Sequence, residues 1–261
     1  MRGRFLFLPL TLAAAPAAAE QLPYVLDDAP ATLPYQVPEE SAAEAATSGP
    51  RLHYGLFDRF EYAAQSGSDG YAWDFSALWG GDRDRLWLSS VGEGGAWSDP
   101  DYLELQALYG RAVGGGLDLN AGLRFDAVPA PERVYLTLGG QLERETGGGD
   151  YWLGAFLYLS HRGEPSARLT GIYNHALTSR LILQPAFEFN ATGEDVPALG
   201  LGRGLSYAEA GLRLRYEIKE AFAPYLGISW ERALGRTARM ARQAGEEPEA
   251  KSLVFGVRSA F

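Results

Sequence analysis

From residue 52 to residue 261, hydrophobic and polar positions alternate in successive segments that are separated by glycine-rich turns. A period of two places neighbouring side chains on opposite faces of a β-strand, and about ten residues are enough for a tilted strand to cross a bilayer. The sequence therefore predicts an all-β fold, a transmembrane antiparallel up-and-down β-barrel of about 12 strands. The expected strands are 52–64, 70–80, 85–94, 102–112, 117–127, 133–144, 150–161, 166–177, 180–191, 205–218, 222–233 and 251–261.

The strand number leaves alternatives open. Ten or fourteen strands also fit, because segments 52–64 and 85–94 are the least regular. An even number brings both ends of the barrel to the same side, which we expect to be the periplasm. The short turns would then lie on the periplasmic side and the longer loops, including 194–204 and 234–250, on the outside.

The two faces of each strand differ in chemistry. In segment 117–126, Leu119 and Leu123 share one face, whereas Asn120, Arg124 and Asp126 share the other. An outer-membrane barrel turns its apolar face to lipid and its polar face to the lumen, and a soluble β-sandwich would reverse this arrangement. We therefore expect the polar sets to line the lumen.

Segment 52–64 contains one exception to this alternation. Asp58 falls on the same parity as Tyr54, Leu56 and Phe60, which we expect to face lipid. Either a β-bulge near Phe57 resets the register, or Asp58 lies near a membrane interface, where a charge is less costly.

The N-terminal 50 residues lack this alternation. A basic start, an apolar run from Phe5 to Ala15 and small residues before Glu20 predict a secretory signal peptide over 1–19. Residues 20–50 contain five prolines and no sustained period, which predicts a disordered periplasmic arm. The expected organisation is therefore signal peptide 1–19, arm 20–50 and outer-membrane barrel 51–261.

The amino-acid composition limits the kinds of metal site and partner that we expect. The chain has no cysteine, which excludes disulfides and thiolate metal sites, and its formal net charge of −10 disfavours nucleic acid and favours cations as partners. Ser160 and His161 are neighbours on a predicted strand and so face opposite sides, which excludes them as a nucleophile–base pair. We expect no enzymatic activity.

Several stretches carry a more specific signal in their non-apolar residues. They resemble the copper resistance protein B (CopB) family, whose members are outer-membrane barrels of bacterial copper-handling systems, over nearly all of 52–261. The matching stretches are Tyr71-Ala-Trp-Asp74, Gly80-Gly-Asp82, Arg85-Leu-Trp-Leu88, Leu105-Gln-Ala-Leu-Tyr109, Arg180-Leu-Ile-Leu-Gln-Pro185, Leu212-Arg-Leu-Arg-Tyr-Glu-Ile218, Phe222-Ala-Pro-Tyr225 and Ser229-Trp-Glu-Arg232.

The resemblance implies a protein of the Gram-negative cell outer membrane, with an acidic lumen for copper and often a Met- and His-rich segment before the barrel. This sequence departs from that pattern, because residues 20–50 contain neither Met nor His and Met240 is the only methionine after Met1. Cu(I) favours thioether and thiolate ligands. We therefore expect copper as cargo or as a weakly bound ion.

Carboxylates on many predicted strands would face the lumen. They attract divalent cations but hold Cu(II) loosely when nitrogen ligands are lacking. The candidate metal-contacting residues are His53, Glu61, Asp74, Glu93, Glu104, Asp126, Glu188, Glu209, Glu231 and Met240. The competing interpretation is that these carboxylates pair with inward arginines and pack the lumen. Those arginines are Arg59, Arg85, Arg124, Arg168, Arg213, Arg215 and Arg258.

The three histidines do not form a recognisable metal-binding motif. His53 lies at the start of the first strand on the parity that we expect to face inward, and His161 and His175 fall on lipid-facing parity near strand ends. No two histidines have the short spacing of a preformed metal chelate.

Two functions fit these observations. The first is copper binding and passage through an acidic lumen; the second is a plugged barrel that serves as a structural or docking platform for a periplasmic copper protein. We also expect segments 52–64 and 251–261 to pair and close the barrel in outer-membrane lipid. Phe261 would then lie at the periplasmic rim as a signal for the barrel-assembly machinery.

Overall fold

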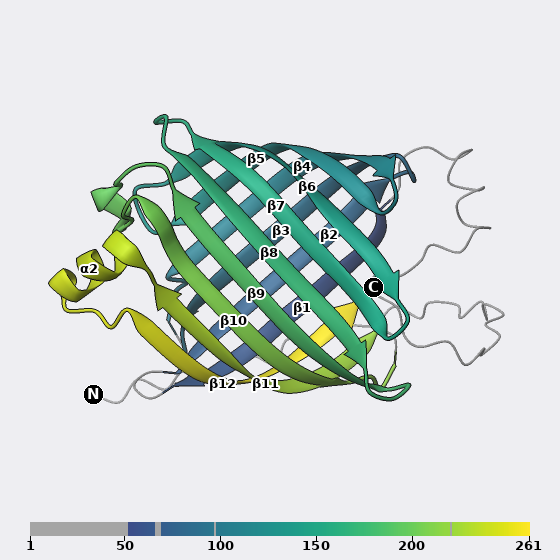
Figure 1. Ribbon diagram of the computed structural model, residues 1–261. Coiled ribbons are helices and arrows are strands. Elements are labelled where there is room, and N and C mark those ends of the chain that lie inside the picture. Colours follow the sequence, from purple (N-terminus) through teal and green to yellow (C-terminus); the bar gives the residue numbers. More distant parts are fainter. Residues whose placement is uncertain (1–51, 66–68, 97, 220) are drawn as a thin grey trace, which may run out of the picture.

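The computed structural model describes residues 52–65, 69–96, 98–219 and 221–261, without the side chains of Leu52 and His53. Twelve antiparallel strands close into one barrel, with β1 paired to β12 (Figure 1). The strands are β1 (Leu52–Gln65), β2 (Gly70–Gly80), β3 (Asp84–Gly95), β4 (Tyr102–Gly114), β5 (Leu117–Val128), β6 (Arg133–Thr146), β7 (Gly149–Ser160), β8 (Pro165–Ala176), β9 (Leu181–Thr192), β10 (Gly204–Tyr216), β11 (Phe222–Ala233) and β12 (Glu249–Ala260).

The predicted fold class is confirmed, and each strand begins and ends within two residues of its expected limits. The expected signal peptide and arm lie outside the described residues. Among the residues that are described, no helix has the length and apolar character needed to cross a membrane.

The two ends of the barrel differ in the length of their connections. We call the turn end the one with the short connections, where Phe261 also lies, and the loop end the opposite one. At the turn end, Gly116 has φ 72°, and a Cβ there would lie 1.9 Å from the Glu143 carbonyl oxygen, so this tight turn requires glycine. The loop end carries the 3₁₀ helix η1 (Pro197–Leu199) and the α-helix α2 (Gly235–Ala244). Figure 1 shows α2 at this end of the barrel.

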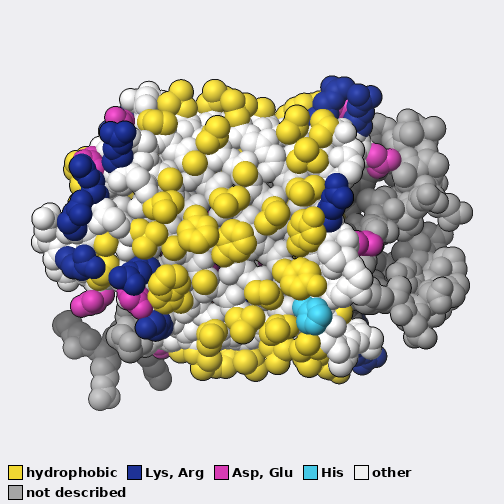
Figure 2. Space-filling view, in the orientation of Figure 1, with side chains coloured by type: hydrophobic (Ala, Val, Ile, Leu, Met, Phe, Trp, Pro, Cys, Tyr) yellow, Lys and Arg dark blue, Asp and Glu magenta, His cyan; other side chains and the backbone are white. Residues whose placement is uncertain are grey.

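The outer surface is apolar across its middle. Figure 2 shows hydrophobic side chains over the centre of the visible face, with charged side chains gathered toward both ends. This surface includes Leu123, Leu157 and Ile228, which are 56%, 65% and 58% exposed. Leu119 and Leu123 lie on it, whereas Asn120, Arg124 and Asp126 are buried, as the alternation predicted.

A β-bulge in β1 resolves the exception at Asp58. The register of β1 shifts between Phe57 and Arg59 against β2 and between Phe57 and Glu61 against β12. Asp58 therefore faces the lumen and accepts a hydrogen bond from Arg258 Nε at 3.2 Å. The bulge also places Tyr54 and Leu56 on the cavity wall, so the expectation that these two side chains face lipid was wrong.

Helix α2 lies within the segment that we expected to be a loop, 234–250. Its sequence, GRTARMARQA, has few apolar residues, and Thr237 and Ala238 are its buried positions. Gly245, with φ 82°, accommodates the left-handed residue that ends the helix. Thr237 Oγ1 accepts a hydrogen bond from the Gly202 amide at 3.0 Å, so the helix is attached to the β9–β10 loop.

Candidate functional site

The barrel encloses a cavity of about 1190 Å³ that extends along the lumen. Asp101 and Val196 line it at the loop end, and Asp82 and Gly114 line it at the turn end. The cavity thus reaches both ends of the barrel. Side chains from the polar faces of the strands determine what a solute inside it would meet.

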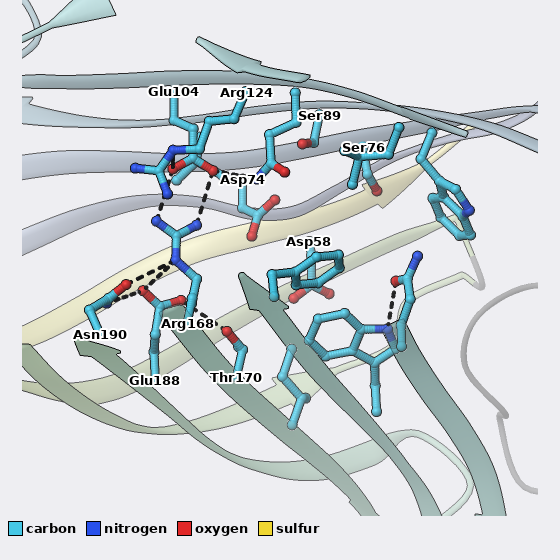
Figure 3. Close-up of a pocket in the computed structure, with 18 of the residues that line it drawn as sticks. Asp58, Asp74, Ser76, Ser89, Glu104, Arg124, Arg168, Thr170, Glu188 and Asn190 are labelled. Atoms are coloured by element: carbon cyan, nitrogen blue, oxygen red, sulfur yellow. Dashed lines mark hydrogen bonds and ion pairs between the residues drawn. The ribbon is translucent and has the colours of Figure 1, made fainter. Parts of the chain in front are cut away.

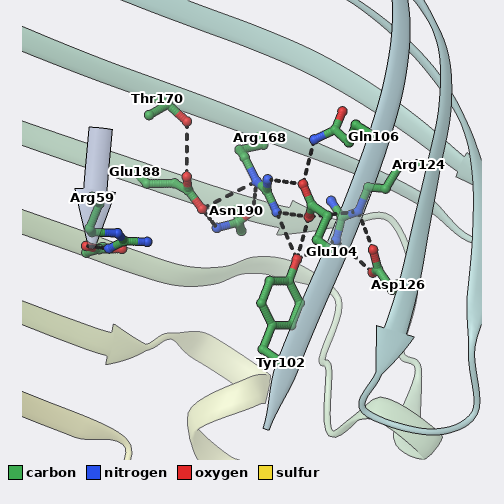
Figure 4. Close-up of polar contacts among 11 residues, drawn as sticks. Arg59, Tyr102, Glu104, Gln106, Arg124, Asp126, Arg168, Thr170, Glu188 and Asn190 are labelled. Carbon is green, nitrogen blue, oxygen red and sulfur yellow. Dashed lines mark hydrogen bonds and ion pairs between the residues drawn. The ribbon is translucent and has the colours of Figure 1, made fainter. Parts of the chain in front are cut away.

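A cluster of polar side chains fills the part of the lumen between β4 and β8 (Figure 4). At its centre, Glu104 is 1% exposed and accepts hydrogen bonds from Arg168 Nη1 and Nη2 at 3.0 and 2.8 Å. Arg124 Nε lies 2.9 Å from Glu104 and 2.6 Å from Asp126. We call these residues, with Tyr102, Gln106, Glu188 and Asn190, the β4–β8 cluster.

A second cluster joins β1 to β10 and β11. Glu61 accepts two hydrogen bonds from Arg213, at 3.1 and 3.0 Å, and one from the Tyr225 hydroxyl at 3.0 Å. Arg59 donates a hydrogen bond to Glu209 at 3.2 Å and lies 3.9 Å from Glu61. This β1–β10 cluster packs charged groups into the lumen wall on the other side of the barrel.

Further ion pairs lie nearer the turn end, where Arg85 meets Asp118 at 3.3 Å and Arg215 meets Glu217 at 3.6 Å. With these and the Asp58–Arg258 contact, all seven arginines that we predicted to face inward form ion pairs. The predicted pairing is therefore confirmed for Glu61, Glu104, Asp126, Glu188 and Glu209.

Three of the predicted lumen carboxylates behave differently. Asp74, Glu93 and Glu231 line the cavity, and among the described residues their carboxylates have neither a hydrogen bond nor an ion pair. Asp74, Glu93 and Glu231 still interact electrostatically with Arg59, and Glu231 does so with Glu209 and Glu93 as well. Figure 3 shows Asp74 among the side chains that line the cavity, together with Glu104 and Arg168. These three carboxylates thus lack a directly contacting partner among the described residues.

The other candidate metal ligands do not converge. Met240 lies on α2 at the loop end, and the side chain of His53 lies outside the described residues. His161 Nδ1 accepts a hydrogen bond from the Val134 amide at 3.2 Å, and His175 contacts the Gly148 carbonyl at 3.0 Å near the turn end. In the part of the chain that the structure describes, no three His, Asp or Glu side chains are grouped to hold a metal ion.

Aromatic residues also line the lumen, and their contacts with the charged side chains were not predicted from the sequence. Arg124 lies over the rings of Tyr135 and Tyr158, at 5.0 and 4.7 Å from their centroids. The Tyr102 hydroxyl donates a hydrogen bond to Glu104. The inward parity of these tyrosines was available from the sequence, but their contacts cross several strands and depend on the three-dimensional register.

Two carboxylates outside the strands have shifted acidities. Hydrogen bonds from the Arg133 guanidinium, at 2.8 and 3.2 Å, lower the pKa of Glu164 in the β7–β8 loop. The Arg203 backbone amide, followed by the Arg236 guanidinium, lowers the pKa of Asp195 in the β9–β10 loop. Both carboxylates therefore hold loop-end segments in place while they are ionised.

A closed barrel with an apolar outer belt and a charged lumen defines this protein as an outer-membrane β-barrel protein. A solved structure of the NanC porin has the same fold, with a TM-score of 0.53 and 13% sequence identity over 80% of this chain and 99% of that one.

Sequence comparisons show the family to which this chain belongs. The family described as copper resistance protein B precursor (CopB) matches residues 51–261. "Copper resistance protein B" of Escherichia coli is 39% identical over 212 residues, which are 79% of this chain and 68% of that protein. "Copper resistance protein B homolog" of Pseudomonas syringae pv. tomato (strain ATCC BAA-871 / DC3000) is 38% identical over 245 residues, 90% of this chain and 82% of that protein. The chain belongs to the copper resistance protein B family.

Proposed function

We propose that this protein lets copper ions pass through its barrel lumen. The observation that carries the proposal is a cavity that reaches both ends of the barrel and is lined by the unpaired carboxylates of Asp74, Glu93 and Glu231. Fixed negative charge in a confined path raises the local concentration of cations. In this proposal the loop end faces the outside, and both termini lie in the periplasm.

The ligand chemistry suits passage better than storage. Conduction requires sites that attract an ion and then release it, and carboxylate oxygens without nitrogen or sulfur ligands hold Cu(II) weakly. The metal-contacting set in this proposal is His53, Glu61, Asp74, Glu93, Glu104, Asp126, Glu188, Glu209, Glu231 and Met240. Within it, the unpaired carboxylates make the first contacts, and the paired ones shape the path.

A second candidate function draws on the two ion-pair clusters, which fill opposite parts of the lumen. A barrel packed in this way would serve as a structural or docking platform for a periplasmic copper protein. The acidic residues that would bind such a partner, Asp27, Asp28, Glu39, Glu40 and Glu44, lie outside the described residues.

Copper flux into liposomes distinguishes passage through the lumen from the platform function. The purified full-length protein is inserted into liposomes that contain a copper-sensitive dye, and Cu(II) or Cu(I) is added outside. Passage predicts dye responses that rise with the amount of folded barrel and are absent with heat-denatured protein. Responses equal to those of protein-free liposomes for both oxidation states would contradict passage and favour the platform.

A further inference from the structure

The β4–β8 cluster sits inside the cavity and not behind its wall. Arg168, Glu104 and Arg124 all line the cavity, as does Asp74 (Figure 3). We propose that Arg168, held by Glu104 across this part of the lumen, sets the width and the charge selectivity of the pathway. This proposal rests on the cation passage proposed above.

The geometry makes Arg168 part of the pore lining. Strands β5, β6 and β7 separate β8, which carries Arg168, from β4, which carries Glu104. The Arg168 guanidinium lies 5.7 Å from the centre of the Tyr158 ring on β7 and then makes its paired hydrogen bonds to Glu104. The side chain thus spans the sector in front of three strands. Asp74, Glu93 and Arg59 line other parts of the same cavity.

Arg168 is also held at every nitrogen. Its Nε donates a hydrogen bond to Asn190 Oδ1 at 3.1 Å and lies 3.3 Å from Glu188, while Nη1 and Nη2 bond to Glu104. Glu188 is fixed in turn by hydrogen bonds from Thr170 and Asn190. A planar guanidinium with all of these donors engaged is pre-organised, so it acts as a fixed positive charge and a fixed obstacle.

The net charge of the cluster gives Arg168 and Glu104 opposite effects on the charge of the pathway. The cluster contains three carboxylates, from Glu104, Asp126 and Glu188, and two guanidinium groups, from Arg124 and Arg168. Removing the Arg168 charge makes the path wider and more negative. Removing the Glu104 charge leaves both arginines under-compensated and makes the same path less negative.

The substitutions Arg168→Gln and Glu104→Gln are compatible with folding by this geometry. In Arg168→Gln, Glu104 keeps Arg124 as an ion-pair partner at 2.9 Å. In Glu104→Gln, Arg124 keeps Asp126 and Arg168 keeps Glu188. The double variant Arg168→Gln/Glu104→Gln removes the Arg168–Glu104 ion pair with no change in net charge. It therefore distinguishes an effect of the width of the pathway from an effect of its charge.

The test is conductance and reversal potential of single barrels in a planar lipid bilayer under a KCl gradient, without copper. Arg168→Gln should raise the conductance and raise the K⁺/Cl⁻ permeability ratio about twofold or more, and Glu104→Gln should lower that ratio. The double variant should raise the conductance with the wild-type ratio nearly unchanged. Arg236→Gln is the matched control, because Arg236 on α2 pairs with Asp195 of the β9–β10 loop and does not line the cavity.

A wild-type barrel that is closed to KCl and opens on Arg168→Gln would also support the role of the Arg168–Glu104 ion pair. Unchanged conductance and unchanged reversal potential in Arg168→Gln and in the double variant would overturn it, as would shifts of the same sign in the two single variants. Because potassium chloride is the probe, these outcomes are independent of whether copper crosses the wild-type barrel.

Discussion

At the scale of single residues, the reach of the arginines divides the lumen carboxylates into two groups. Glu61 and Glu104 are engaged by guanidinium groups from other strands, whereas Asp74 and Glu93, on equally inward positions, make no such contact among the described residues. Paired carboxylates neutralise buried charge, and unpaired ones add a field to the cavity. The two groups should therefore respond differently to the same chemical change.

Neutralising Glu61 should destabilise the barrel, because Arg213 and the Tyr225 hydroxyl would lose their shared partner. We expect Glu61→Gln to lower the free energy of unfolding by roughly 3 kcal/mol, since breaking a buried pair leaves one charge uncompensated. Asp74→Asn is the matched comparison and should change it by less than about 1 kcal/mol, because Asp74 makes neither a hydrogen bond nor an ion pair among the described residues. Urea unfolding of the folded protein in lipid vesicles measures both, and equal losses would contradict this division.

The β7–β8 loop should respond to acid. Hydrogen bonds from Arg133 lower the pKa of Glu164 in the folded protein, so its stabilising effect is complete above the unfolded pKa of about 4.3 and is lost as the pH falls through the folded pKa. Proteolysis at 161–164 should therefore increase at acidic pH. Glu164→Gln should show the acid pattern already at neutral pH; a pH-independent cleavage rate in the wild type would refute this coupling.

At the scale of the elements, the seam between β1 and β12 closes the barrel and depends on one glycine. Gly55 exchanges two backbone hydrogen bonds with Phe261, at 2.7 and 2.9 Å. A Cβ at Gly55 would lie 2.7 Å from the Phe261 ring, so the ring occupies the space that a side chain would need. The predicted pairing of segments 52–64 and 251–261 is confirmed, and Phe261 lies at the turn-end rim.

Disturbing this seam should impair barrel formation. We expect deletion of Phe261 and substitution Gly55→Val each to reduce the heat-modifiable, folded fraction in outer-membrane preparations. Gly81→Val is the control, because a Cβ at Gly81 meets no atom within 4 Å. Wild-type amounts of folded barrel in both seam variants would show that closure does not need this contact.

The sequence predicted most of the elements because lipid imposes a strict period of two on every strand. It did not decide the register of β1, since a bulge at Asp58 exchanges the faces of Tyr54 and Leu56 without changing their hydrophobicity. It also missed α2, which is short, has few apolar residues and is attached by contacts such as Thr237 to Gly202.

At the scale of the whole molecule, the strand alternation predicts which residues face the lumen but not which of them meet. Arg168 and Glu104 are 64 residues apart and pair only because the closed barrel brings β8 and β4 to the same level. The division between ion-pair clusters and free carboxylates therefore appears only in the folded barrel. The proposed function depends on that division, since the free carboxylates add negative charge that no contacting arginine compensates.

Copper flux through proteoliposomes at two ionic strengths is the most direct test of this account. The triple variant Asp74→Asn/Glu93→Gln/Glu231→Gln should lose most of the flux at low salt and less of it at high salt, because salt screens the field of these side chains. The control Glu132→Gln/Glu194→Gln/Glu246→Gln removes the same charge from exposed loop-end residues that do not line the cavity, and it should keep most of the wild-type flux. Wild-type flux in the Asp74/Glu93/Glu231 variant at both ionic strengths would contradict the proposed function.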